Sequence, residues 1–417
     1  HNGRRRQRQM CIRDSPDPSQ AIPIDPTPSE RECNNIEQHT RLLVRATVPG
    51  AGKSHAVLSR YEDNCLVVCP TNALCVESQH KFPRCKVMTL HSFLRISPDA
   101  EGETKPDEYE YDSEELLDAD EDKSLTPKPF PEKDKVLLLD EIYMHHISLL
   151  QKLYFRLKGT TAIKVFATGD SNQLPPVGES SRDQKTRSEF KERQERAIGI
   201  LFPQQMTFHE CKRCLLEEDN RLMEKICHEM QALSGENIME CIQLIKRYFK
   251  PVSYDEAIEM IKSDPIGYLS VCYFNKTCHD VAYSVLGGTK AVKGVRLVNR
   301  KREPGRYSGI LMVNYEYLVN RVNRKSGTVD LQCMDDKDTH KKITTTIDHV
   351  SEHMHWSYTR TCHSLQGTSV EGNIILHDLW SKFMTKEYLY TAITRARRID
   401  SVYYVEDGPR CKEEHTV

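Results

Sequence analysis

The chain has 417 residues, of which 38% are hydrophobic, and a formal net charge of −2. This length predicts more than one domain, and no apolar run reaches the roughly 20 residues that a membrane-spanning helix needs. The 15 irregularly spaced cysteines and the lack of a visible secretory signal exclude a disulfide-stabilised secreted domain, and they predict a soluble intracellular protein without membrane contact.

The charge is distributed unevenly along the chain. Residues 99–135 contain 15 acidic and 5 basic residues and so carry −10, which leaves +8 on the remainder. A mildly basic body is compatible with a polyanionic partner. We expect residues 98–135 to form a partly disordered insertion, because they are too polar to bury a core. Residues 1–35 are predicted to be a non-native tail and linker, with the natural N-terminus missing.

The first motif, VPGAGKS at residues 48–54, lies between an apolar strand pattern and a helix pattern. A Gly-rich turn in this position can hold phosphate, because backbone N–H groups and the helix N-terminus point at the anion. We expect Lys53 to reach the β- and γ-phosphates of ATP and Ser54 to ligate Mg²⁺. Thr47 stands where the full pattern has its first glycine. The predicted nucleotide contacts here are Gly50, Ala51, Gly52, Lys53, Ser54 and His55.

Two further apolar strand patterns end in polar residues. Residues 136–139 lead into Asp140 and Glu141, and residues 163–168 lead into the loop GDSNQLPPV, which contains Gln173. Carboxyl ends of parallel strands are where open α/β sheets bind ligands. We therefore expect Asp140 to hold Mg²⁺, Glu141 to polarise the attacking water, and Gln173 to lie at the γ-phosphate.

The second half of the chain repeats the α/β pattern around a β-rich stretch. Residues 207–233 are predicted to form a turn and a helix, and residues 269–274 a strand. The pair Cys211 and Cys214 is not favoured as a zinc site, because Cys227 and His228 are adjacent and no second such pair follows. Short strand patterns at residues 295–298, 310–313 and 315–319 indicate a small β-barrel insert. Strands at residues 373–376 and 402–405 close the chain.

The order of these motifs resembles that of the superfamily 1B helicases, in particular the RecD-like and Pif-type DNA helicases. The motifs are GKS, PTN at residues 70–72, LHSF at 90–93, LLLDE at 137–141, GDSNQLPPV at 169–177, CHSLQGTS at 362–369 and YTAITRAR at 390–397. The resemblance implies an α/β fold with two RecA-like domains that carry parallel sheets. It places the first domain (1A) at residues 36–203, with residues 98–135 as its 1B region. The second domain (2A) follows at 204–417, with an SH3-like insert (2B) at about 290–350.

The same resemblance implies roles for individual residues. Arg213 and Arg395 match the arginines that reach across the cleft to the γ-phosphate, and with Lys53, Glu141 and Gln173 they complete the catalytic set. Gln366 and Gly367 are implied at the nucleotide. The residues that match positions holding the backbone of a nucleic-acid strand are Thr71, Asn72, His91, Ser92, Thr361, His363 and Ser364.

The resulting hypothesis is an ATP- and Mg²⁺-dependent helicase that moves 5′→3′ on single-stranded DNA and opens tailed duplexes in replication, recombination or repair. We expect it to act as a monomer, with replication proteins as its further partners. Three alternatives stay open at this point. One is a viral-type RNA helicase, since no residue decides recognition of the 2′-OH. The others are a DNA-stimulated ATPase switch that does not unwind, and the motor portion of a larger replication protein.

Overall fold

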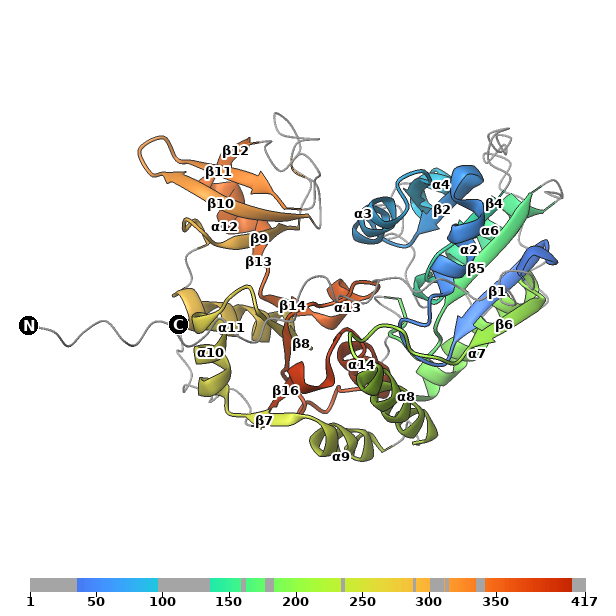
Figure 1. The fold of residues 1–417 in the computed structure, drawn as a ribbon. Coiled ribbons are helices and arrows are strands. Elements are labelled where there is room, and N and C mark those ends of the chain that lie inside the picture. Colours follow the sequence, from blue (N-terminus) through green and yellow to red (C-terminus); the bar gives the residue numbers. More distant parts are fainter. Residues whose placement is uncertain are drawn as a thin grey trace, which may run out of the picture.

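The computed structural model describes residues 36–96, 136–158, 163–176, 184–233, 237–287, 290–300, 311, 315–334 and 342–406. The predicted tail at 1–35 and the predicted insertion at 98–135 lie outside these residues. The described residues form two lobes, each built on a parallel sheet, and a smaller antiparallel sheet beside the second lobe (Figure 1). None of the helices within these ranges combines the length and the apolar character needed to cross a membrane.

The first lobe is built on a six-stranded parallel sheet with the order β3-β2-β4-β5-β1-β6. Its central strands are buried on both faces, as continuous apolar runs require. In β4, for example, Leu138 faces one core cluster while Leu137 and Leu139 face another. The strands are β1 (Arg41–Ala46), β2 (Cys65–Cys69), β3 (Lys86–Thr89), β4 (Val136–Leu139), β5 (Lys164–Gly169) and β6 (Gln204–Phe208).

Helices cover both faces of this sheet, and several begin directly at a strand end. Thr71 caps α3 by accepting a hydrogen bond from the Leu74 N–H, and Thr89 caps α4 through the Ser92 N–H. The helices are α2 (Lys53–Tyr61), α3 (Asn72–Lys81), α4 (Leu90–Leu94), α6 (Ile147–Leu157) and α7 (Gln184–Leu201). Short 3₁₀ turns follow α2 and β4, at Glu62–Asn64 and Ile142–Met144.

The first sheet extends past the boundary predicted between residues 203 and 204. β6 pairs in parallel with β1, from Leu42 opposite Gln204 to Ala46 opposite Phe208, so the first sheet extends to Phe208. The residues after Phe208 lead into α8 (Glu217–Ala232), which packs against α14 (Lys386–Ile393) of the second lobe.

The second lobe is built on a five-stranded parallel sheet with the order β14-β8-β15-β16-β7. β15 and β16 have the bounds that the sequence predicts. The strands are β7 (Lys250–Val252), β8 (Tyr268–Cys272), β14 (Thr359–Thr361), β15 (Asn373–Leu376) and β16 (Val402–Val405). The helices are α8 (Glu217–Ala232), α9 (Ile238–Tyr248), α10 (Tyr254–Ser263), α11 (Asn275–Leu286), α13 (Cys362–Leu365) and α14 (Lys386–Ile393), and a 3₁₀ turn spans Ile399–Ser401.

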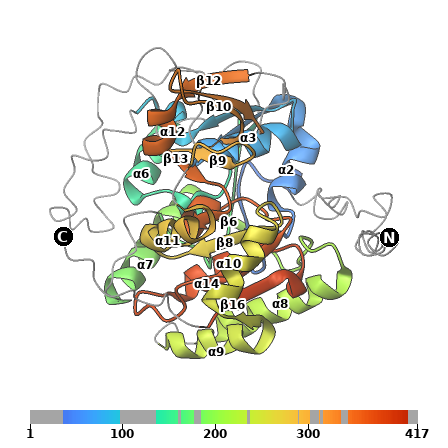
Figure 2. The same cartoon turned by 90° about the vertical axis from the view of Figure 1, so that its left-hand side faces the viewer.

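The β-rich stretch forms an antiparallel sheet with the order β12-β11-β10-β9-β13. It stands on the α10 and α11 side of the second lobe (Figure 2) and shares a hydrophobic core with these helices. The sheet extends past the predicted end at residue 350, because β13 pairs with β9. Of the strand predicted at 310–313, only Leu311 is described. The SH3-like character of the whole insert stays a prediction. The elements are β9 (Arg296–Asn299), β10 (Glu316–Asn323), β11 (Thr328–Cys333), β12 (Lys342–Thr346), α12 (Ile347–His353) and β13 (Met354–Trp356).

The two lobes pack against each other through a shared core. One hydrophobic cluster contains Val44 of β1 and Ile374 of β15. Polar contacts join the lobes as well: the Leu174 N–H donates to Thr391 Oγ1 at 2.9 Å, and the Gln366 side-chain amide donates to the Leu174 carbonyl at 2.8 Å. The lobes therefore meet along the loop that follows β5.

Candidate active site

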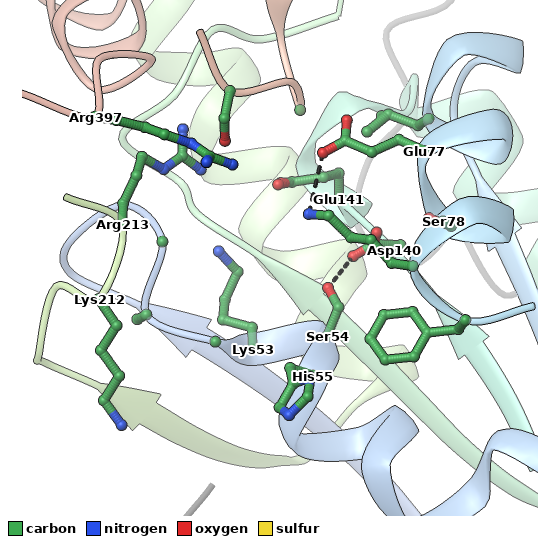
Figure 3. A pocket seen from close by; sticks show the side chains of 18 residues that line it. Lys53, Ser54, His55, Glu77, Ser78, Asp140, Glu141, Lys212, Arg213 and Arg397 are labelled. Atoms are coloured by element: carbon green, nitrogen blue, oxygen red, sulfur yellow. Dashed lines mark hydrogen bonds and ion pairs between the residues drawn. The ribbon is translucent and has the colours of Figure 1, made fainter. Parts of the chain in front are cut away.

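The candidate site lies where the carboxyl ends of β1, β4 and β5 meet the second lobe. The sheet order places these three strands side by side, so the phosphate-binding loop, the Asp140-Glu141 pair and the loop with Gln173 share one edge. A cavity opens at this edge between the lobes (Figure 3).

The backbone of the phosphate-binding loop needs glycine at two positions. Gly50 has φ +62° and Gly52 has φ +76°, in the left-handed region that glycine enters without a Cβ penalty. Gly50 also lies close to Arg213, whose Cβ would be 2.4 Å from a Cβ built on Gly50. Thr47, in contrast, has a negative φ, so the departure from the glycine pattern causes no backbone strain there.

Lys53, Ser54 and Asp140 form the polar floor of the cavity. Lys53 begins α2 and is only 8% exposed, which holds its ammonium group at the loop. The Ser54 hydroxyl donates to Asp140 Oδ1 at 2.6 Å, and the Thr168 hydroxyl donates to the same oxygen. A hydroxyl and a carboxylate next to a phosphate site are the oxygen ligands that Mg²⁺ takes, so these residues fit the predicted cation.

Glu141 is held in an unusual backbone conformation beside Asp140. Its φ is +51°, in the left-handed region, which is uncommon for a residue with a Cβ and is typical of functional sites. Burial raises the pKa of the Glu141 carboxyl, and the nearby Lys53 cation opposes this shift in part. A carboxylate with a raised pKa accepts a proton more readily, which suits a general base.

The cavity is lined from both lobes, and most of the predicted nucleotide and metal residues lie in its wall (Figure 3). The predicted residues that line it are Gly50, Ala51, Gly52, Lys53, Ser54, His55, Asp140, Glu141, Arg213 and Gly367. Gly367 has φ +85° and packs against Leu74 of α3, which brings the second lobe onto the first.

Gln173, Gln366 and Arg395 do not line the cavity, contrary to a direct reading of the motifs. Arg395 is fully buried and donates to the carbonyls of Thr391 and Thr368 and to Gln173 Oε1, at 3.0, 3.1 and 3.2 Å. Burial lowers the pKa of the Arg395 guanidinium to about 10, so the group stays charged at neutral pH. The Gln366 side-chain amide donates its hydrogen bond to the Leu174 carbonyl. In this structure the hydrogen bonds of these three side chains join the two lobes.

Arg213 reaches the cavity from the segment that joins β6 to α8. Its guanidinium donates to the Thr394 carbonyl at 2.6 Å, and the neighbouring Lys212 N–H donates to the Gly50 carbonyl at 3.2 Å. This segment therefore contacts the phosphate-binding loop on one side and the end of α14 on the other.

Sequence reasoning missed part of the cavity wall. Arg397, two residues after Arg395, lies in it, and so does one face of α3. The helical spacing of Leu74, Ser78 and Lys81 is a signal that could have predicted this face. The lining residues that were not predicted are Leu74, Glu77, Ser78, Lys81, Phe82, Lys212, Ser369 and Arg397.

The residues predicted to hold a nucleic-acid strand lie at the carboxyl ends of β2, β3 and β14. All seven retain at least partial solvent exposure, including His363, so it is not a fully packed core histidine. They are Thr71, Asn72, His91, Ser92, Thr361, His363 and Ser364. Burial lowers the pKa of His363, which lines a small hollow between the lobes with Tyr273 and Pro175.

Comparisons with known proteins agree with this architecture. Residues 32–179 match the family model described as an AAA domain. No curated protein matches the chain. The chain matches a solved Pif1 helicase structure with a TM-score of 0.56 and 16% identity, over 91% of this chain and 92% of that one. That structure concerns DNA unwinding at forked double-stranded DNA by two coordinating Pif1 helicases.

Two further solved structures match over nearly the same extent. Bacteroides Pif1 bound to single-stranded DNA has a TM-score of 0.52 and 17% identity, over 90% of this chain and 91% of that one. Pif1 helicase from Candida albicans has a TM-score of 0.52 and 16% identity, over 91% of this chain and 94% of that one. The resemblance and the α/β fold with two parallel sheets, both predicted from the sequence, are confirmed: residues 32–179 match the AAA domain model, and the chain has the fold of the solved Pif1 helicases.

Proposed function

We propose that this protein is an ATP-dependent helicase that moves 5′→3′ along single-stranded DNA and opens duplexes with a 5′ tail. The observation that carries the proposal is the cavity between the lobes. The first lobe supplies the phosphate-binding loop, Lys53 and Glu141, and the second supplies Gly367 and Arg397. A site completed by two lobes couples nucleotide turnover to their relative motion.

The proposed chemistry is attack of water on the γ-phosphorus of ATP. Glu141 accepts the proton as the water oxygen forms its bond to phosphorus, and the bond from phosphorus to the β–γ bridging oxygen breaks to release ADP. Lys53 and Arg213 supply positive charge to the phosphate oxygens. Arg395 holds Gln173 at the edge of this region through their hydrogen bond. Mg²⁺ held by Ser54 and Asp140 would neutralise phosphate charge.

The nucleic-acid strand is proposed to cross the carboxyl ends of both sheets. Thr71, Asn72, His91 and Ser92 lie there on the first lobe, and Thr361, His363 and Ser364 lie on the second. Polar side chains that contact phosphate and sugar carry no sequence information, so we expect sequence-tolerant, salt-sensitive binding. The solved Pif1 structures, one bound to single-stranded DNA and one tied to forked DNA unwinding, support DNA as the partner. We propose a monomeric motor that serves replication, recombination or repair.

ATP hydrolysis measured with no nucleic acid, with single-stranded DNA and with single-stranded RNA tests the proposal. Unwinding of 5′-tailed and 3′-tailed DNA duplexes then tests the polarity. We expect DNA to stimulate hydrolysis and only the 5′-tailed duplex to open, and we expect Lys53→Ala to lose both activities. Lys225→Ala, an exposed lysine on α8, serves as the matched control.

Each other outcome points to a defined alternative. Stimulation by RNA alone would favour an RNA helicase. Stimulation by DNA without any unwinding would favour an ATPase switch.

A further inference from the structure

Arg397 is the arginine of the TRAR segment whose side chain faces the cavity. It lines the same wall as Arg213, and both side chains reach toward the cavity from the same side (Figure 3). Its backbone carbonyl accepts a hydrogen bond from the Leu215 N–H at 3.0 Å, which fixes its main chain beside the segment that carries Arg213. Arg397 is thus placed at the cavity by the backbone as well as by its side chain.

The two arginines of this segment have different surroundings. Arg395 has a fully buried guanidinium that donates to four acceptors within the protein. The Arg397 side chain is 13% exposed, and its ion pair is with Glu371, whose side chain is 78% exposed, at 3.3 Å. An ion pair to an exposed carboxylate is weak, so the Arg397 guanidinium can exchange this partner for a stronger anion.

The charge of the cavity wall favours such an anion. Five cationic side chains and three anionic ones line the cavity, and a bound polyphosphate would offset the excess. Arginine binds phosphate in a bidentate way because its planar fork matches two phosphate oxygens.

We infer that Arg397 contacts the terminal phosphate of the bound nucleotide together with Arg213. This adds the second arginine of the TRAR segment to the groups that bind phosphate. The inference rests on the proposed nucleotide site and adds a phosphate ligand to it.

The test compares Arg397→Ala and Arg397→Lys with the matched control Arg398→Ala. Arg398 is the next residue along the chain, but its guanidinium pairs with Asp400 at 2.7 Å and does not line the cavity. The affinities for ATP, with Mg²⁺ but without nucleic acid, and for ADP are measured by calorimetry or by competition with a fluorescent nucleotide. The turnover number for ATP is measured in parallel, and thermal melting checks that each variant is folded.

A contact to the terminal phosphate predicts a selective loss. Arg397→Ala should weaken ATP binding tenfold or more, change ADP binding less than threefold, and lower turnover tenfold or more. Arg397→Lys should retain part of the ATP affinity because it keeps the charge, and it provides the test if the alanine variant does not fold. Arg398→Ala should behave as the unaltered protein does.

Three results would overturn the inference. The first is an unchanged affinity for both ATP and ADP in both Arg397 variants. The second is an equal loss of ATP and ADP affinity, which would indicate a contact elsewhere on the nucleotide. The third is failure of the unaltered protein to bind either nucleotide, which alone would also overturn the proposed function. If the unaltered protein binds ATP without hydrolysing it, the affinity ratio still decides the role of Arg397.

Discussion

Replacing Gly50 with alanine tests how the phosphate-binding loop and Arg213 fit together. A Cβ at Gly50 would lie 2.4 Å from Arg213 Cβ and 3.1 Å from its Cα, whereas ordinary contact begins at 3.4 Å. The closest contact is to Cβ, the rigid base of the side chain, so the clash requires a shift of about 1 Å between the two segments. Gly50→Ala should therefore move the loop, Arg213, or both.

The expected magnitude follows from this displacement. A misplacement of about 1 Å can lower a catalytic rate about 100-fold, so we expect a loss of turnover of that order. The left-handed φ adds a conformational cost of about 1–2 kcal/mol for any residue with a Cβ. Gly327→Ala is the matched control, since Gly327 has φ +66° and nothing within 4 Å of the added Cβ. Steady-state ATP hydrolysis and urea unfolding of both variants separate the two effects.

The two variants should differ in ATP turnover, whereas the conformational free energy lost at the left-handed backbone position should be similar in both. Gly327→Ala should lose about 1–2 kcal/mol of stability and retain the turnover of the unaltered protein. The reasoning is wrong if Gly50→Ala hydrolyses ATP within threefold of Gly327→Ala.

Other variants probe the floor of the cavity and the contacts between the lobes. Lys53→Ala should abolish ATP turnover in a phosphate-release assay yet change the Kd for single-stranded DNA less than about threefold, and a large loss of DNA binding would contradict the separation of the two sites. Gln173→Ala and Arg395→Lys should each lower the turnover number. Because one hydrogen bond joins the two side chains, the double variant should have about the turnover number of the less active single variant. Additive losses would show that the two residues act separately. Burial opposes ionisation of Glu387, but its ion pair with Lys191 outweighs this and lowers its pKa. The ionised carboxylate therefore stabilises the fold above its unfolded pKa of about 4.3, and this contribution is lost as the pH falls through the folded pKa. Urea unfolding between pH 7 and 3 should show Glu387→Gln about 1–2 kcal/mol less stable at pH 7 and the gap closing on acidification, whereas parallel curves would contradict the ion pair.

Much of the fold could be predicted because its central strands are continuous apolar runs that end in polar or Gly-rich turns. β4 and β15 are of this kind, and their buried residues alternate between two cores. The phosphate-binding loop was equally clear, since its glycines, Lys53 and Ser54 are adjacent in the sequence. Local patterns of this kind do not depend on the partner lobe.

β6 was missed because it is an edge strand with a weak apolar pattern. It pairs on one side only, with β1, and its first four residues are exposed or partly exposed. A strand of this kind looks like a polar turn in the sequence. The predicted boundary between residues 203 and 204 therefore precedes this strand of the first sheet.

Which arginine of the TRAR segment lines the cavity, Arg395 or Arg397, could not be predicted from the sequence. Both follow the end of α14 at Ile393, and which side chain turns toward the cavity depends on packing against Thr368 and Gln173 of distant segments. The face of α3 that lines the cavity could not be predicted for the same reason, since the opposite wall comes from the second lobe, which is distant in the sequence.

A crystal structure with Mg²⁺ and a non-hydrolysable ATP analogue tests the central claim most directly. The account predicts the triphosphate in the cavity, with its β- and γ-phosphates within hydrogen-bond distance of the Lys53 ammonium and its γ-phosphate in contact with Arg213 from beyond the first sheet. A nucleotide bound by residues of the first lobe alone, with the arginine turned to solvent, would contradict it.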